Sequence, residues 1–163
     1  MTDESTQAKF NERLSPSIFA ALADPQSANM GDRYPTSKLL EILTVRSLAS
    51  AISSSPNSPK VILNTPSPGF CHSALMRDTT GLGAYAMHGM KAIFARTTEV
   101  GARNFIAAAC AGEESHGQYM SECVVKEPSA FVRSREGEVT QGRVYDELMA
   151  ILEGIQPGIG KNI

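Results

Sequence analysis

Tryptophan is absent from this chain of 163 residues, and aromatic residues of all kinds make up only 6% of it. A surface on which nucleic-acid bases stack is therefore not expected. Positive charge is not in excess either, because 15 lysines and arginines stand against 17 aspartates and glutamates, for a formal net charge of −2. This balance gives no electrostatic footprint for nucleic acid or for an anionic membrane.

Cysteine is too sparse for a disulfide framework or a zinc site. Cys71, Cys110 and Cys123 are an odd number, and no CxxC pair occurs. Cys71 and His72 have no further ligands at suitable spacing, so we predict no metal site. Free thiols indicate a reducing compartment.

Long apolar runs are also missing. No apolar stretch approaches the roughly 18 residues of a membrane span, and the polar, acidic start of the chain does not resemble a signal peptide. We therefore expect a cytoplasmic protein without a membrane span.

What is present is the composition of a globular domain, with 42% hydrophobic and 20% charged residues. Apolar residues recur with helical spacing in four segments, and Thr97 and Gly112 are suited to cap the third of these at its start and its end. The predicted helices are Pro35 to about Ile52, residues 84–96, the residues after Thr97 to about Ala111, and Val139–Ile155.

Two segments have the β-type composition of strands. Lys60–Asn64 is a short apolar run, which predicts a buried strand, and Thr65–Gly69 turns the chain at its carboxyl end. Gln118–Val125 is the second predicted strand. A parallel pair needs a long crossover, and residues 70–117 supply one, so we expect an α/β fold. In such sheets ligands bind at the carboxyl ends of the strands.

Tyr34 and Lys38 are the most informative pair in the chain. They lie four residues apart at the start of the predicted 35–52 helix, so the phenol and the ammonium can approach each other on one helical face. A neighbouring cation favours the phenolate form and lowers the pKa of a tyrosine from about 10. Such a phenol can donate or accept a proton near neutral pH, as carbonyl reduction or alcohol oxidation requires.

These motifs together resemble the short-chain dehydrogenase/reductase family. Tyr34-x-x-x-Lys38, the run Val61-Ile62-Leu63-Asn64 and Pro68-Gly69-x-x-x-Ser73 follow one another in the family's order. The runs Gly31–Glu41, Pro68–Cys71 and Glu114–Gly117 are similar to retinol-dehydrogenase-like members from fungi. The similarity extends from about Lys9 to Ile155.

The resemblance implies an oxidoreductase that uses NAD(P), with NADP slightly favoured, to interconvert an alcohol and a ketone, in fungal secondary metabolism. It implies that Tyr34 is the catalytic acid/base and that Lys38 lowers the pKa of Tyr34 and binds the nicotinamide ribose. Pro68 and Gly69 would line the nicotinamide. Ser73 stands where the family usually has a threonine near the carboxamide. The segment Leu75–Phe94 corresponds to the lid over the substrate.

The resemblance covers only the C-terminal portion of the family's Rossmann-type doubly wound parallel sheet, here mostly helical with two or three strands. Ahead of Tyr34 nothing matches the strand and GxxxGxG turn of the nucleotide-binding half. The catalytic serine has no clear counterpart, with Thr2 and Ser5 nearest to its place. We expect one incomplete domain, 1–163, with an irregular lead-in at 1–33, a catalytic part at 34–125 and a tail and helix at 126–163.

Two alternatives stay open. The chain could instead be a catalytically inactive, truncated member that acts as an interaction protein, or a gene-model fragment. Without the missing half, the first strand would have an unpaired apolar edge, so self-association or a partner chain that covers this edge is expected. The GxGxxA match at Gly81–Ala86 follows no predicted strand and is better interpreted as a lid hinge. Ser115 and His116 are adjacent but lie in no GxSxG motif, so a hydrolase is not favoured.

Overall fold

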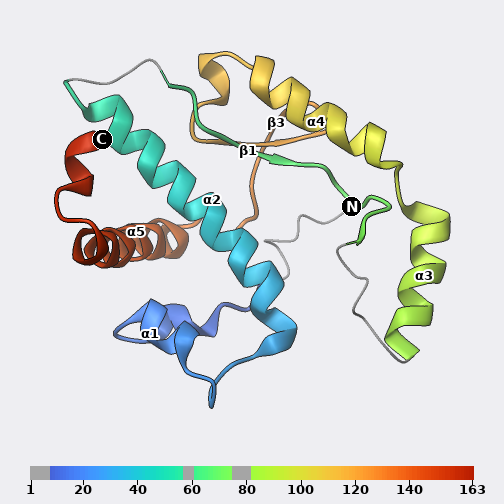
Figure 1. Ribbon diagram of the computed structural model, residues 1–163, viewed down its shortest axis with the longest axis horizontal. Helices are drawn as coiled ribbons and strands as arrows, with labels where there is room; N and C mark the ends of the chain where they lie inside the picture. The colour runs from blue at the N-terminus through green and yellow to red at the C-terminus, as the bar shows by residue number, and fades with distance from the viewer. Residues whose placement is uncertain (1–7, 57–60, 75–81) are drawn as a thin grey trace.

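The computed structural model describes residues 8–56, 61–74 and 82–163. Its main elements are helices, grouped around a small three-stranded sheet (Figure 1). The helices are α1 (Ile18–Ala23), α2 (Met30–Ser54), α3 (Leu82–Phe94), α4 (Thr98–Cys110) and α5 (Arg135–Ile155), and the strands are β1 (Asn64–Ser67), β2 (Gln118–Ser121) and β3 (Val124–Lys126). Short 3-10 helices occur at Asn11–Leu14, Glu113–Ser115 and Ile159–Asn162.

Helix α2 positions the Tyr34–Lys38 pair. The sequence predicts its start at Pro35, but it begins at Met30, so Pro35 lies inside the helix. Pro35 lacks the N–H that would donate to the Gly31 carbonyl four residues earlier, so α2 loses one backbone hydrogen bond there, while Asp32 in the first turn suits the positive end of the helix dipole. The expected lead-in of short helical pieces is present over residues 8–29.

Strand β1 differs in its bounds from the predicted Lys60–Asn64 strand. Pairing with β2 begins at Asn64 and ends at Ser67, opposite Gln118 and Ser121, so the strand occupies the segment that the sequence assigned to a turn. The two strands are parallel, as predicted. Pro66 lacks an amide N–H, which is tolerated because β1 is an edge strand. All four residues of β1 are half-buried rather than buried, and Lys60 lies outside the described residues.

The predicted second strand is in fact a hairpin. Strands β2 and β3 are antiparallel and are joined by Glu122 and Cys123, both with left-handed backbone at φ of 56° and 64°. Two consecutive positive φ values form the tight turn that suits the twist of a hairpin. Neither residue is the glycine or asparagine usual at such a turn, so the reversal could not be predicted from residue type.

The caps of α4 and α5 explain where these helices begin. The Thr97 Oγ1 accepts the N–H of Val100 at 3.3 Å, as predicted, and the Ser134 Oγ accepts the N–H of Gly137 at 3.0 Å, so α5 starts four residues before the predicted Val139. The predicted cap at Gly112 is wrong. Helix α4 ends at Cys110, the next residue Ala111 has extended backbone, and Gly112 precedes the next 3-10 helix instead.

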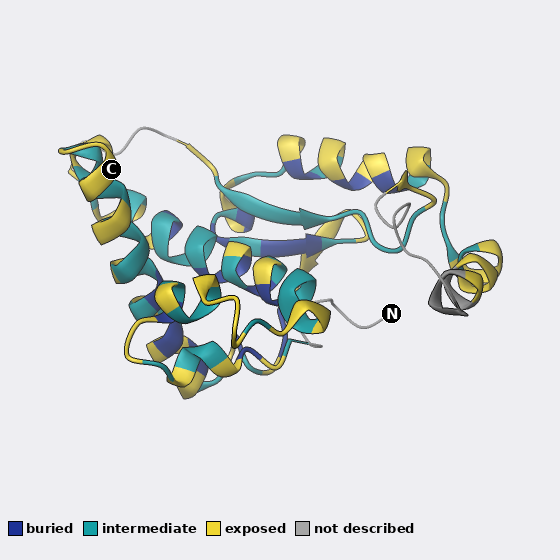
Figure 2. Cartoon of the chain, turned by 60° about the horizontal axis from the view of Figure 1, so that its bottom comes forward, coloured by how far each residue is buried: buried dark blue, intermediate teal, exposed yellow. Residues whose placement is uncertain are grey.

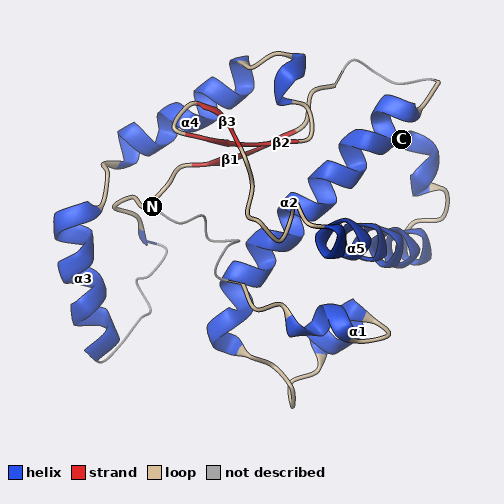
Figure 3. Cartoon of the chain, turned by 180° about the vertical axis from the view of Figure 1, so that it is seen from behind, coloured by secondary structure: helices blue, strands red, loops and turns tan. Residues whose placement is uncertain are grey.

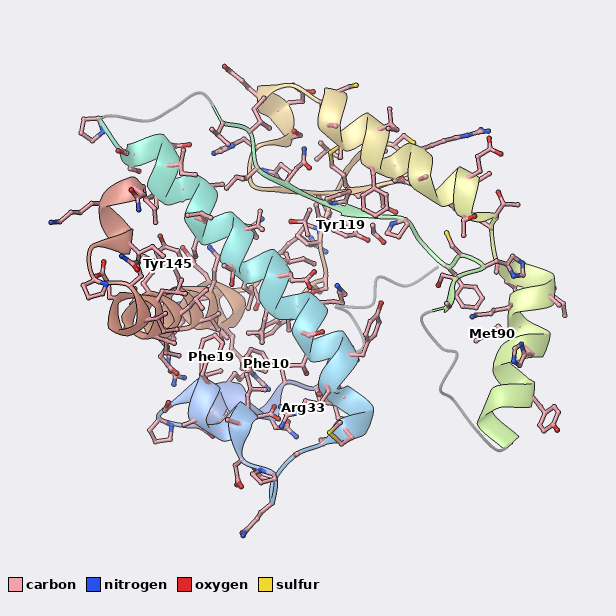
Figure 4. The ribbon with its side chains drawn as sticks, in the orientation of Figure 1. Phe10, Phe19, Arg33, Met90, Tyr119 and Tyr145 are labelled. Atoms are coloured by element: carbon pink, nitrogen blue, oxygen red, sulfur yellow. The ribbon has the colours of Figure 1, made fainter. Side chains whose placement is uncertain are left out.

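The sheet lies between two helical layers, with α4 on one face and α2 with α5 on the other (Figure 2). The core between α1, α2 and α5 is formed by buried apolar residues, and Figure 4 shows Phe10 and Phe19 between α1 and α5. Its buried members are Phe10, Ile18, Leu39, Ile42, Leu43, Tyr119, Val132 and Val144. Helix α3 stands apart from this core at the far side of the sheet (Figures 1 and 3).

Helix α3 carries an apolar, exposed surface. Tyr85 and Ile93 are 79% and 77% exposed, and Phe94 is 67% exposed. The predicted lid, Leu75–Phe94, therefore contains this helix, while residues 75–81 of the lid and Gly81 of the GxGxxA match lie outside the described residues. Across the part of the chain that the structure describes, no helix is long and apolar enough to cross a membrane.

Candidate active site

All five site residues expected from the sequence line one pocket. Tyr34 and Lys38 reach it from α2, and Pro68, Gly69 and Ser73 from the loop after β1. The pocket has a volume of about 760 Å³ and is mostly apolar, with further walls from α3, α4 and β2. Two segments more than 25 residues apart in the sequence thus meet at the carboxyl end of a parallel strand, where the α/β fold places ligands.

Tyr34 and Lys38 are close to each other, as their spacing predicts. The Lys38 Nζ lies 5.9 Å from the centroid of the Tyr34 ring. The same Nζ donates to both carboxylate oxygens of Glu41, at 2.8 and 3.0 Å. Glu41 also lines the pocket. Three ionisable side chains, at positions 34, 38 and 41, therefore follow one face of α2 into the site.

The first turn of α2 is attached to the lead-in through Asp32. Its carboxylate accepts the backbone N–H groups of Lys9 and Phe10 and the hydroxyl of Thr36, at 3.0 to 3.2 Å. Phe10 is only 1% exposed and has a left-handed φ of 42°, so this attachment is built into the core. Tyr34 follows Asp32 by two residues and is held at its place in the pocket by this anchor.

The loop after β1 is shaped by a glycine and by close packing. Gly69 has a φ of 73°, a conformation that glycine adopts without strain, and its N–H is donated to the Ser67 Oγ at 3.3 Å. Gly101 of α4 approaches Cys71 so closely that a β-carbon at position 101 would collide with the Cys71 Sγ. The Sγ is itself held by the Pro68 carbonyl at 3.3 Å. This part of the pocket wall is therefore closely packed, and position 101 does not accommodate a side chain larger than that of glycine.

Helix α3 contributes a second cation to the pocket. Lys91 of α3 lines the pocket, and its Nζ donates to the backbone carbonyl of Ser73 at 3.0 Å. This bond connects α3 to the loop that carries the site residues. Sequence reasoning missed both Glu41 and Lys91. The position of Glu41 three residues after Lys38 is the signal that would have found the first, whereas Lys91 follows only from the tertiary fold.

The histidine next to Ser115 has a structural position. The His116 Nδ1 accepts the N–H of Leu63 at 3.2 Å, so Nε2 carries the proton and donates to the Ala49 carbonyl at 3.0 Å. The Ser115 Oγ donates to Gly112 and accepts from the Asn64 amide instead. His116 thus joins α2, β1 and β2, and Ser115 and His116 do not form a nucleophile and base.

A GxxxGxG spacing that sequence reasoning missed occurs late in the chain, at Gly154, Gly158 and Gly160. It follows helix α5 rather than a strand, and the N–H groups of Gly158 and Gly160 are donated to the Glu153 carboxylate at 2.6 and 2.9 Å. A nucleotide loop needs a strand before it and amides turned toward the phosphates. This segment therefore does not replace the family's nucleotide-binding turn.

Several curated fungal proteins are similar to the chain. A short-chain dehydrogenase of Penicillium roqueforti is 39% identical over 163 residues, which cover 98% of this chain and 43% of that protein. A short chain dehydrogenase/reductase of Cryptosporiopsis is 42% identical, over 99% of this chain and 49% of its own length. One from Gibberella zeae is 37% identical, over 93% of the chain and 44% of its length. No protein-family model and no solved structure matches the chain.

The parallel pair of strands with its flanking helices defines an α/β protein, and the Tyr34–Lys38 pair lies beside the Pro68–Gly69 loop in its pocket. With these relatives, the chain belongs to the short-chain dehydrogenase/reductase family. It spans just under half the length of the curated relatives it matches, from 43% to 49%.

The pocket fits one end of the family's nicotinamide cofactor. Thr65 lines the pocket, and its Oγ1 is buried without a hydrogen-bond partner among the described residues. The mostly apolar walls suit a nicotinamide ring, and Lys38 and Ser73 offer donors beside it. For the adenosine and phosphate end, the described residues that line the pocket supply no glycine-rich turn after a strand.

Proposed function

We propose that this chain supplies the proton-transfer residues of an NAD(P)-dependent short-chain dehydrogenase/reductase that interconverts a small alcohol and a ketone. One observation supports this most strongly. Tyr34, Lys38, Pro68, Gly69 and Ser73, each of which the family resemblance assigns to catalysis or cofactor binding, line a single pocket. Helix α2 and the loop after β1 supply them separately, so their meeting is a property of the fold.

In this proposal Tyr34 is the group that exchanges a proton with the substrate. During reduction its phenol donates a proton to the substrate oxygen as that oxygen becomes an alcohol, and during oxidation the phenolate takes the proton back. The Lys38 ammonium, 5.9 Å from the ring centroid, favours the phenolate form and holds the ribose hydroxyls. Pro68, Gly69 and Ser73 orient the nicotinamide. A bound nicotinamide supplies or accepts the hydride.

The remaining part of the cofactor site belongs to another segment in this proposal. Strand β1 pairs with β2 on one side, and no other strand among the described residues pairs with its second edge. Val61 and Ile62, just ahead of β1, are 45% and 39% exposed. An open edge next to apolar side chains is a template for strand pairing. We infer that a nucleotide-binding segment, from the same polypeptide, a partner chain or a second copy, pairs there.

Cofactor binding tests the proposal. We expect a fluorescence titration of NADPH with the purified chain to give weak, saturable binding, and NADH to bind about as well, because the two cofactors share the nicotinamide end. The Tyr34→Phe variant should keep this affinity and lose any turnover of a ketone substrate. Tyr145→Phe, on α5 and outside the pocket, is the matched control and should behave as the parent chain. Absence of binding at millimolar cofactor would contradict the proposal for this chain alone.

The second candidate is an interaction protein without catalysis, and the open edge of β1 is the observation that favours it. It predicts self-association, or capture of a strand from a partner, with no binding of cofactor. Sedimentation at several concentrations, run with and without NADPH, separates the two candidates. A concentration-independent monomer that binds NADPH would exclude the second. A cytoplasmic location stays a prediction from composition, and a place in fungal secondary metabolism stays a prediction of the family resemblance.

A further inference from the structure

The interaction that the family pattern does not explain is the one between Lys38 and Glu41. The Glu41 carboxylate binds the Lys38 Nζ through both oxygens, at 2.8 and 3.0 Å. Both side chains line the pocket, and they are only partly exposed, at 39% for Lys38 and 54% for Glu41. An exposed ion pair three residues apart on a helix adds little stability. Its main effect is therefore expected on the charges within the pocket.

The charges around Tyr34 show what this pair does. Lys38 is the cation that favours the phenolate, and Glu41 lies on the same face of α2 and opposes that cation. The other titratable side chains that line the pocket are Cys71 from the loop, Lys91 from α3 and Tyr119 from β2, whereas the lining residues of α4 carry no charge. Glu41 is thus the one carboxylate among the described residues that line the pocket.

We propose that Glu41 is a positioning residue that holds the Lys38 ammonium in the pocket and offsets part of its effect on the Tyr34 phenol. The inference rests on the proposed function, because it concerns the same proton donor. Both carboxylate oxygens of Glu41 bind the Lys38 Nζ, so a ribose that binds Lys38 competes with this carboxylate. When a ligand draws Lys38 away, the full charge of the ammonium becomes available to Tyr34.

The proposal predicts how the Tyr34 phenol titrates without any cofactor. Replacing Glu41 by glutamine removes the opposing charge and keeps the shape of the side chain. We expect the midpoint of Tyr34 ionisation to fall by about half a pH unit, in line with the usual strength of a partly exposed pair. Replacing Lys38 by methionine leaves the carboxylate without its partner and should raise the midpoint.

Carbon-13 NMR of chains labelled at the tyrosine Cζ measures this directly, and a Tyr34→Phe spectrum assigns the signal. Burial raises the pKa of Tyr145 above its ordinary value of 10, with the nearby Asp146 adding to the rise, so its signal provides an internal comparison. Glu99→Gln is the matched control, because Glu99 pairs with Arg103 at 3.0 Å on α4 and does not line the pocket. It should leave the Tyr34 midpoint unchanged.

An unchanged Tyr34 midpoint in a folded Glu41→Gln chain would overturn the proposal, as would an equal shift in Glu99→Gln. If Glu41→Gln does not fold, Glu41→Ala serves as the second variant, since alanine suits a helix. The titration contains no cofactor, so its outcome is independent of the NADPH experiment. Failure of NADPH to bind would contradict the proposed function, while a shifted midpoint would still support the coupling of Glu41, Lys38 and Tyr34.

Discussion

The Asp32 carboxylate accepts the backbone N–H of Phe10 at 3.1 Å and so joins the start of helix α2 to the most deeply buried aromatic residue of the core. The same carboxylate accepts from Lys9 and Thr36. The position of Tyr34, two residues further along α2, thus depends on a contact with a segment more than 20 residues earlier. This relationship leads to the first prediction.

Asp32→Asn should weaken the attachment of Lys9 and Phe10 to the first turn of α2. Asparagine keeps one acceptor oxygen but loses the charge and places an NH2 group opposite backbone N–H groups, so we expect a loss of about 1–3 kcal/mol in the free energy of unfolding. Denaturation by urea measures this loss. Asp24→Asn is the control, because among the described residues Asp24 bonds to its own turn, at Gln26 and Ser27. An equal loss in both variants would contradict the role given to Asp32.

Gly101→Ala should disturb the floor of the pocket. A β-carbon at position 101 collides with the Cys71 Sγ, which the Pro68 carbonyl holds, so we expect a loss of about 1–3 kcal/mol in stability. Cys71→Ala in the same chain removes the sulfur and leaves Pro68 as the next neighbour, at 3.4 Å from the added carbon. Thermal unfolding of Gly101→Ala and of the double variant with Cys71→Ala tests whether the collision causes the loss of stability. A double variant less stable than Gly101→Ala would show that the collision is not the cause.

The C-terminal turn should respond to acid. Hydrogen bonds from Gly160 and Gly158 hold the pKa of Glu153 below its ordinary value of 4.5. A lowered pKa in the folded state means that the turn is stabilised above pH 4.5, and that this stabilisation is lost as the pH falls through the folded value. The amide shifts of Gly158 and Gly160 should therefore titrate with a midpoint below 4.5. Glu153→Gln should abolish this titration, and a midpoint at or above 4.5 would contradict the assignment.

Local chemistry made the helices predictable. Thr97 caps α4 as expected, and the apolar spacing located α2 and α5 correctly except at their first turns. The start of α2 was missed because Pro35 is usually a sign of a helix boundary, whereas here the helix continues through it. The start of α5 is set by the local Ser134 cap, which apolar periodicity does not reveal, whereas Asn29 precedes α2 without a side-chain cap.

Strand bounds and the electrostatics of the site were not predictable in the same way. The apolar run at 61–63 indicated a strand, but pairing is decided by β2, which begins opposite Asn64. The hairpin turn at Glu122 and Cys123 uses residues without an intrinsic preference for positive φ. The residues of the family motif line one pocket, and their roles stay predictions of the resemblance. The contact of Lys38 with Glu41 required knowing which face of α2 meets the pocket.

The central claim is that the pocket between α2 and the loop after β1 receives the nicotinamide end of the cofactor. Nitrogen-15 NMR of the chain, titrated with reduced nicotinamide mononucleotide, tests it most directly because this ligand lacks the adenosine end. We predict saturable shifts concentrated at Tyr34, Lys38, Gly69 and Ser73, all of which line the pocket. No shifts at millimolar ligand, or shifts confined to residues outside the pocket, would contradict the claim.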